Sequence, residues 1–170
     1  MAYIHVYTGN GKGKSTAAFG LAVRAHYAGM KVYIGQFVRD MAYHETQIAR
    51  DLDNILIEQL GRGCYLDRNP DPKDVDAAEA GLERCAKFLA SGEYQMVILD
   101  ELTIALYFKL ITKEQILQAL RGRHPDTEVV ITGRYAPDWL IEEADLVTDM
   151  QEVKHYYTGQ GVEARDGIER

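Results

Sequence analysis

The sequence has little of what marks secreted or membrane-spanning proteins. It has two cysteines, Cys64 and Cys85, in 170 residues, too few for a disulfide framework and too far apart for a C-x-x-C motif, which favours a reducing compartment. No apolar run approaches the roughly 18 residues that a bilayer span needs, and the first residues lack the basic and apolar regions of a signal peptide. We therefore expect a cytoplasmic protein that makes no use of a membrane.

Acidic residues outnumber basic ones. Nineteen Lys and Arg stand against 26 Asp and Glu, a formal net charge of -7, which disfavours broad binding of nucleic acid or anionic membranes and leaves room for a local basic patch. Fifteen glycines, four prolines and 46% hydrophobic residues are ordinary for a folded chain. The length suits one domain, so we expect residues 1–170 to form a single domain.

Short β-rich runs alternate with longer helical patterns along the chain. This alternation predicts an α/β fold, with a mainly parallel sheet of five or six strands and helices on both faces. A first helix is expected to begin at Ser15 and to stop at Gly29. The expected strands are 3–7, 32–38, 55–60, 96–100, 128–132 and 146–148.

Two further helices carry clear start signals. Asp71 and Pro72 suit the first turn of a helix that runs to about Ala90, and Thr112 with Gln115 forms a capping-box pattern for another. The first of these helices has an apolar stripe at three- and four-residue spacing, which we interpret as a core face with Cys85 as a buried packing residue. The apolar stripe consists of Val75, Ala78, Leu82, Cys85 and Leu89. The opposite face, which we expect to be solvated, carries Glu79, Glu83 and Lys87.

A glycine-rich segment follows the first expected strand and opens the first expected helix. Its glycines would turn backbone N–H groups into one concavity, Lys14 adds a charge, and Ser15 offers a hydroxyl to Mg²⁺. The alternative, a glycine-rich turn without a ligand, is disfavoured by the asparagine and two lysines between the glycines. The segment predicts a phosphate-binding loop (P-loop) in a P-loop NTPase-like fold, built from Gly9, Asn10, Gly11, Lys12, Gly13, Lys14 and Ser15.

This loop departs from the common pattern G-x-x-x-x-G-K-[ST]. Thr8 stands where the pattern has glycine, and counting from Gly9 the loop is one residue shorter. The triphosphate therefore need not lie as it does in an ordinary NTPase. Lys12 adds a second cation, which an enzyme that handles the whole triphosphate as one unit could use.

Two carboxylates, Asp100 and Glu101, end the apolar run 97–99. P-loop proteins hold Mg²⁺ with such an acidic strand end beside the loop Ser or Thr. Ser15 and one carboxylate are thus expected to bind Mg²⁺ or Mn²⁺, and the sequence does not say which carboxylate is nearer. An acidic strand end that faces solvent is the alternative.

Taken together, several segments resemble the P-loop ATP:corrinoid adenosyltransferase family. The resemblance runs through nearly the whole chain in order, and the shortened loop is itself distinctive of that family. It implies a transferase that moves the 5′-deoxyadenosyl group of ATP to the cobalt of a reduced corrinoid and releases triphosphate, in adenosylcobalamin synthesis or salvage. The segments are 8–20, Arg24, Gln36-Phe37, 99–103, 130–134, 144–148, Lys154-His155 and 161–169.

The resemblance also implies roles for single residues. Residues 9–16, which end at Thr16, would bind the phosphates. Lys12 and Lys14 would be the catalytic cations that stabilise the leaving triphosphate. Arg24 would contact the nucleotide, and Glu101 would bind Mg²⁺. Arg134 is either a further nucleotide contact or a surface arginine. Tyr65 is the one ring of the segment 61–66 that could meet the corrinoid. His155 has a structural and a catalytic interpretation, and the other histidines show no zinc-ligand spacing.

Partners follow from the same resemblance. It implies a homodimer, and a reductase that supplies Co(I). Relatives often carry an N-terminal extension that covers the corrinoid, whereas the first expected strand here begins at about Tyr3, so the sequence leaves the closure of that site open. Two other functions stay open as well: a P-loop ATPase or kinase that acts on the terminal phosphate, and a module that binds ATP and corrinoid without converting them.

Overall fold

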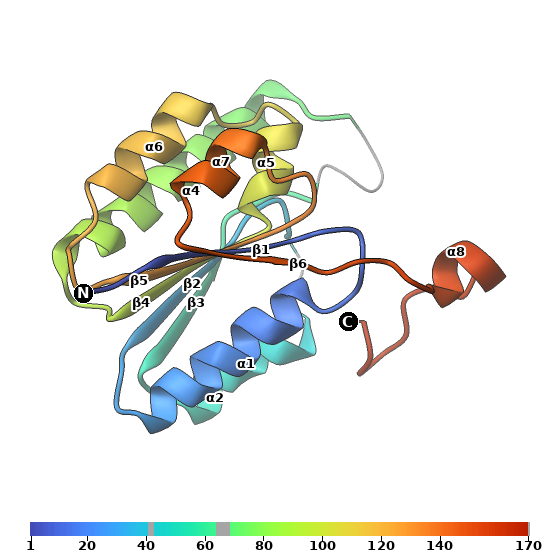
Figure 1. The fold of residues 1–170 in the computed structure, drawn as a ribbon, viewed down its shortest axis with the longest axis horizontal. Coiled ribbons are helices and arrows are strands. Elements are labelled where there is room, and N and C mark those ends of the chain that lie inside the picture. Colours follow the sequence, from blue (N-terminus) through green and yellow to red (C-terminus); the bar gives the residue numbers. More distant parts are fainter. Residues whose placement is uncertain (41–42, 64–68, 170) are drawn as a thin grey trace.

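The strands of this protein form one parallel sheet. The computed structural model describes residues 1–40, 43–63 and 69–169. Six strands pair in the order β3-β2-β4-β5-β1-β6, and every pair is parallel (Figure 1). The strands are β1 (Ile4–Thr8), β2 (Val32–Gln36), β3 (Ile55–Gln59), β4 (Met96–Asp100), β5 (Glu128–Thr132) and β6 (Leu146–Asp149).

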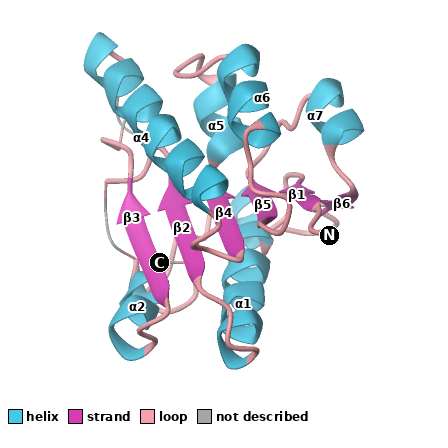
Figure 2. Cartoon of the chain, turned by 90° about the vertical axis from the view of Figure 1, so that its left-hand side faces the viewer, coloured by secondary structure: helices cyan, strands magenta, loops and turns pink. Residues whose placement is uncertain are grey.

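Helices cover both faces of this sheet (Figures 1 and 2). One face carries α1 (Lys14–Tyr27) and α2 (Ile48–Asp51), the latter preceded by the 3₁₀ turn His44–Gln47. The other face carries α4 (Pro72–Ser91), α5 (Leu102–Tyr107), α6 (Lys113–Arg121) and α7 (Asp138–Glu143). The short helix α8 (Tyr156–Gln160) stands beyond the edge of the sheet, after β6. The predicted α/β fold is confirmed.

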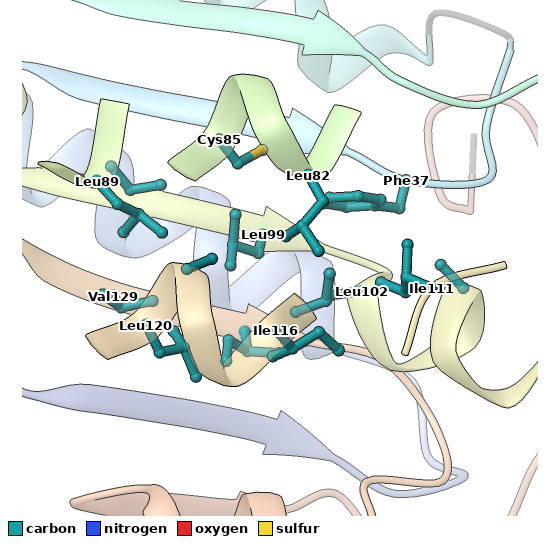
Figure 3. Packing of buried hydrophobic residues seen from close by; sticks show 14 of the residues in the cluster. Phe37, Leu82, Cys85, Leu89, Leu99, Leu102, Ile111, Ile116, Leu120 and Val129 are labelled. Carbon is teal, nitrogen blue, oxygen red and sulfur yellow. The ribbon is translucent and has the colours of Figure 1, made fainter. Parts of the chain in front are cut away.

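The core consists of two apolar layers, one on each face. Strands β2 and β4 are buried at every position, as expected of central strands with helices on both sides. Figure 3 shows Leu82, Cys85 and Leu89 of α4 directed toward the layer that contains Leu99 of β4. Cys85 is fully buried there, which confirms its packing role.

The expected strand boundaries are partly confirmed. The strands expected at 3–7, 32–38, 55–60 and 146–148 run instead over 4–8, 32–36, 55–59 and 146–149. The second of these ends early because Val38 takes a left-handed φ of 68°. Strands 96–100 and 128–132 lie as predicted, and Gly29, just past α1, has the left-handed φ of 80° that a helix end needs. Asp71 caps α4 as expected and also forms a capping box with Asp74, which was not predicted. The predicted capping box of Thr112 with Gln115 forms at α6.

Two further expectations, both about helices, differ from the structure. Helix α1 begins at Lys14 rather than Ser15, because Gly13 takes the cap position with a φ of 123°. Glu79 of α4 is not simply solvated, since its carboxylate accepts a hydrogen bond from Gln115 Nε2 of the adjacent α6 at 2.7 Å. The packing of α4 against α6, which a single-helix pattern does not report, causes this difference.

The carboxyl ends of the parallel strands meet at one edge of the sheet. Ligands bind at this edge in open α/β sheets. The loop after β1, the acidic end of β4 and the ends of β2 and β5 all lie there. Among the described residues, no helix is long and apolar enough to cross a membrane.

Candidate active site

The loop between β1 and α1 has the backbone of a phosphate-binding loop. Gly9 has a φ of 99° and Gly13 one of 123°, both in the region that favours glycine. Gly11 N donates to the carbonyl of Met150 at 2.7 Å, and a Cβ on Gly11 would lie 2.6 Å from that oxygen. The loop is therefore held against the chain that follows β6, and it has no room for a side chain at Gly9 or Gly11.

Lys14 lies inside this loop. Its side chain is 8% exposed, and Nζ donates to the carbonyl of Gly11 at 2.6 Å. Burial lowers the pKa of Lys14, and the nearby Arg134 lowers it further, while Glu101, Asp100 and Asp149 oppose the shift. A buried ammonium held inside the glycine loop is well placed to attract a phosphate group.

Ser15 and Asp100 meet across the sheet edge. Ser15 Oγ donates to Asp100 Oδ1 at 2.7 Å, and Thr132 Oγ1 from the end of β5 donates to the same oxygen at 2.6 Å. Gln36 Nε2 donates to Asp100 Oδ2 at 3.1 Å, and Asp100 is fully buried. The loop hydroxyl and the acidic strand end, which the sequence predicts to act together, are in direct contact.

Glu101, the second carboxylate, faces a different set of charges. Its backbone is left-handed with a φ of 60°, and its N–H donates to Thr132 Oγ1 at 3.0 Å. Its side chain, 17% exposed, lies 3.6 Å from Arg39. Burial raises the pKa of Glu101 and Asp100 raises it further, while Arg39, Lys14 and Arg134 oppose the shift. A non-glycine residue held in this conformation is typical of functional sites.

Lys12 binds partners in the C-terminal segment, whereas Lys14 binds within the loop. Its Nζ donates to Glu169 Oε1 at 2.9 Å and to the hydroxyl of Tyr156 at 3.4 Å. Arg165 stacks over the Tyr156 ring at 4.8 Å and also pairs with Glu169. In Figure 1 the chain after α8 turns back toward the loop between β1 and α1. Residues 156–169 therefore form part of the site's surroundings, which no local sequence pattern indicated.

The remaining predicted residues lie at different distances from this centre. Arg134 is exposed but electrostatically close to both Lys14 and Glu101. Arg24 is exposed on α1, about 13 Å along the helix from Ser15 at about 1.5 Å per residue, and it interacts with Tyr7 of β1. Asn10 and Thr16 are exposed at the loop. Tyr65 lies outside the described residues.

His155 has a structural contact. Its Nδ1 accepts the N–H of Tyr157 at 3.2 Å and thereby caps α8. In residues 1–40, 43–63 and 69–169, no three His, Cys, Asp or Glu side chains are grouped to hold a metal ion. A site of one or two carboxylates with a hydroxyl, as Mg²⁺ uses, does not need such a group.

Several residues of the site were not assigned a role from sequence. Gln36, Arg39 and Thr132 each follow or end an apolar strand run, and a polar residue at the carboxyl end of a parallel strand is the signal that could have found them. Glu169 has no such signal, because its contact with Lys12 joins positions 157 residues apart.

The parallel sheet, the glycine loop that opens α1 and the Ser15–Asp100 contact are features of a P-loop-like α/β domain. The sequence matches the family described as ATP:corrinoid adenosyltransferase BtuR/CobO/CobP over residues 1–170, and the chain belongs to this family.

Individual relatives agree with this assignment. The chain is 37% identical to the corrinoid adenosyltransferase of Pseudomonas aeruginosa, over 96% of this chain and 81% of the relative. It is 34% identical to the corrinoid adenosyltransferase of Escherichia coli K12, over 98% of this chain and 84% of the relative. It is 32% identical to corrinoid adenosyltransferase CobA of Salmonella typhimurium, also over 98% of this chain and 84% of the relative. The resemblance drawn from the sequence is confirmed.

Proposed function

We infer that this chain is an ATP:corrinoid adenosyltransferase, which transfers the 5′-deoxyadenosyl group of ATP to the Co(I) of a reduced corrinoid and releases triphosphate. The family membership supports this activity. The observation that carries it is the shortened P-loop with a buried Lys14, whose neighbour Ser15 contacts Asp100.

The protein does not have to supply the nucleophile of this reaction, because Co(I) is the nucleophile. The Co(I) electron pair forms the bond to C5′ of ATP while the C5′–O bond breaks, and the electron pair of the broken C5′–O bond leaves with the triphosphate. The protein must align C5′ with cobalt and stabilise the charge on the leaving group. Lys14 and the loop N–H groups, with Lys12 at the rim, are the residues we assign to that charge.

The oxygen donors at the sheet edge fit Mg²⁺, or Mn²⁺ in its place. A triphosphate carries about four negative charges near neutral pH, more than two lysines and a helix N-terminus offset in a partly dehydrated site. The Ser15 hydroxyl and the Asp100 carboxylate, 2.7 Å apart, would hold the cation, with Glu101 as the second candidate carboxylate. The bound cation would supply charge neutralisation of the triphosphate.

The corrinoid is proposed to lie beside the loop after β3. Gly61 N donates to the carbonyl of Arg39 at 3.2 Å, and Gly63 N donates to that of Val38 at 2.8 Å. This loop therefore starts next to Arg39, which itself faces Glu101. Tyr65 follows within two residues of Gly63, and we keep it as the ring proposed to contact the corrinoid.

We propose that residues 1–170 form one adenosyltransferase domain, which acts as a homodimer in the cytoplasm and receives Co(I) from a reductase. The continuous six-stranded sheet supports a single domain. Sedimentation velocity of the purified chain tests the dimer, and reconstitution with and without a reductase tests the source of Co(I).

Product analysis tests the reaction. With ATP, Mg²⁺ and chemically reduced corrinoid, we expect inorganic triphosphate and a photolabile cobalt–carbon bond in equal amounts. ADP as the stoichiometric product would instead identify a P-loop ATPase or kinase. Binding of both substrates without turnover would identify a non-catalytic module.

A further inference from the structure

Gln36 is a buried amide at the ligand-binding edge of the sheet. It ends β2, is fully buried, and lies directly beside Asp100 in the β2–β4 register. Its Nε2 donates to Asp100 Oδ2 at 3.1 Å. Its Oε1 is buried too, and has no hydrogen-bond partner among the residues that the structure describes.

An unpartnered buried acceptor calls for an explanation. Buried side-chain oxygens are nearly always paired with protein or ordered water, and an apolar side chain of the same size would avoid the cost. The preceding residues of β2 are buried as well, so packing alone would favour an apolar residue at its end. A polar side chain in this place indicates a donor that arrives with a ligand.

The other atom of the amide helps to orient Asp100. Asp100 Oδ1 receives the hydroxyls of Ser15 and Thr132, and Oδ2 receives Gln36 Nε2. A donor on Oδ2 fixes the rotation of the carboxylate, so that Oδ1 keeps facing the loop hydroxyl. Groups that orient a metal-binding carboxylate in this way commonly affect metal affinity by about 10- to 100-fold.

We propose that Gln36 is a positioning residue of the cation–triphosphate site: Nε2 holds Asp100 toward Ser15, and Oε1 accepts a hydrogen bond from a water molecule that the bound cation keeps. This rests on the proposed function, because it assumes that a divalent cation binds with ATP. Mg²⁺ retains several waters in such sites, so a hydrogen-bond donor for Oε1 would be available.

The substitution Gln36→Met tests this, since it keeps the length of the side chain and removes both polar atoms. We expect the affinity of the ATP-bound protein for Mn²⁺, measured by electron paramagnetic resonance, to fall about tenfold. ATP affinity in EDTA should stay within about twofold of wild type. Tm should change little, because the unpaired acceptor is removed together with the Nε2 donor of the buried Asp100, and these two effects on stability oppose each other.

Thr127→Val is the matched control. Thr127 is equally buried, and its hydroxyl donates to the carbonyl of Tyr94 at 2.9 Å at the opposite, amino edge of the sheet. This variant loses a buried polar group of the core and should leave Mn²⁺ affinity as in wild type. Unchanged Mn²⁺ affinity in Gln36→Met, or an equal fall of ATP affinity in EDTA, overturns the proposal.

A second measurement keeps the test open if Gln36→Met does not fold. In a crystal structure of the wild-type protein with Mn²⁺ and ATP, Oε1 should lie within hydrogen-bond distance of a water that also binds the ion. An Oε1 that is unpaired, or paired with protein, overturns the proposal. The transfer activity of the wild-type protein distinguishes failure of the proposed function from failure of the role of Gln36. If the wild-type protein does not transfer the adenosyl group, the proposed function fails. If it does, and Gln36→Met leaves Mn²⁺ affinity unchanged, only the proposed role of Gln36 is rejected.

Discussion

The ammonium of Lys12 and the carboxylate of Glu169 form a 2.9 Å ion pair across 157 positions of the chain. Tyr156 also donates its hydroxyl to Glu169, and Arg165 pairs with the same carboxylate at 3.4 Å. The Glu169 hydrogen bond raises the pKa of Lys12, and hydrogen bonds from Tyr156 and then Lys12 lower the pKa of Glu169. Both groups are therefore charged near neutral pH, and a phosphate that approaches Lys12 meets a competing anion.

Glu169→Gln should tighten the binding of inorganic triphosphate. The amide keeps the shape but removes the charge that competes for Lys12, so we expect a two- to fivefold lower Kd, as for other partly exposed ion pairs. Isothermal titration calorimetry at low ionic strength measures this, and the gain should shrink at high salt because salt screens exposed charges.

Two further variants isolate the Lys12 contact. Glu163→Gln removes an equal charge from an exposed position of the same segment and should leave the Kd as it is. In a Lys12→Met background, Glu169→Gln should have no effect beyond that of Glu163→Gln. Weaker binding in the single Glu169→Gln variant would mean that Glu169 orders Lys12 for the phosphate rather than competing with it.

Lys14→Ala should slow adenosyl transfer by about 100-fold or more, the usual cost of losing a buried group that stabilises a leaving charge. Corrinoid binding should remain nearly intact, because Lys14 acts on the triphosphate inside the loop. Single-turnover formation of the cobalt–carbon bond and corrinoid titration measure the two effects. Lys87→Ala, an exposed lysine on α4, controls for the loss of a positive charge. Equal loss of corrinoid affinity in Lys14→Ala would contradict the assignment.

Asp100→Asn and Glu101→Gln should differ in their effect on metal-dependent ATP binding. Asp100 accepts hydrogen bonds from Ser15, Gln36 and Thr132. In Asp100→Asn, the amide NH₂ would face at least one of these donors, and that hydrogen bond would be lost. We expect Asp100→Asn to reduce Mg²⁺-dependent ATP affinity more than tenfold. Glu101→Gln should have a smaller effect that high Mg²⁺ partly restores. The reverse ranking would assign the cation to Glu101.

Glu101→Gln should also stabilise the fold at neutral pH. The pKa of Glu101 is raised in the folded protein, chiefly by burial, so the ionised form is disfavoured there relative to the unfolded chain. This cost is absent below the unfolded pKa, grows as pH rises through the interval between the two pKa values, and is complete above the folded pKa. The Tm of the variant should therefore match wild type near pH 4 and exceed it at pH 8. A constant Tm difference across this range would show that Glu101 ionises freely in the fold.

Cys85 should resist thiol reagents in the native protein. Burial raises its pKa to about 12, so at pH 8 it is almost wholly protonated, and the core shields it from solvent. In a Cys64→Ser background, we expect no reaction with Ellman's reagent until denaturant is added, and then about one thiol per chain. Rapid labelling under native conditions would show that α4 opens readily.

The accuracy of the sequence-based fold prediction depended on how local each signal is. Strand β4 and helix α4 were predicted closely, because an apolar run with a sharp polar end and an Asp-Pro start are properties of neighbouring residues. Helix α5 was not predicted, since it begins directly after β4 through the left-handed Glu101 and has no side-chain cap. Its start depends on tertiary structure that local propensity does not contain.

The same distinction holds for the site. The P-loop and its contact with the acidic end of β4 were predictable, because the loop motif and the acidic strand end each have a recognisable form and parallel strands bring both to one edge. That Asp100 rather than Glu101 accepts the Ser15 hydroxyl was not predicted. The partner of Lys12 was not, since nothing near Glu169 in sequence specifies a contact with the first loop. The role proposed for Gln36 depends on its buried Oε1 having no hydrogen-bond partner among the described residues, and only the three-dimensional structure shows this.

The strand order has a consequence for how the chain folds as it is synthesised. Strand β1 is made first, yet it lies between β5 and β6, whose residues 128–132 and 146–149 leave the ribosome late. Its apolar side chains and backbone must therefore wait for both neighbours, as sequence-distant pairing slows folding. The nascent chain thus carries its phosphate-binding loop before the sheet edge that shapes it exists. Such an exposed strand is where chaperones would be expected to act.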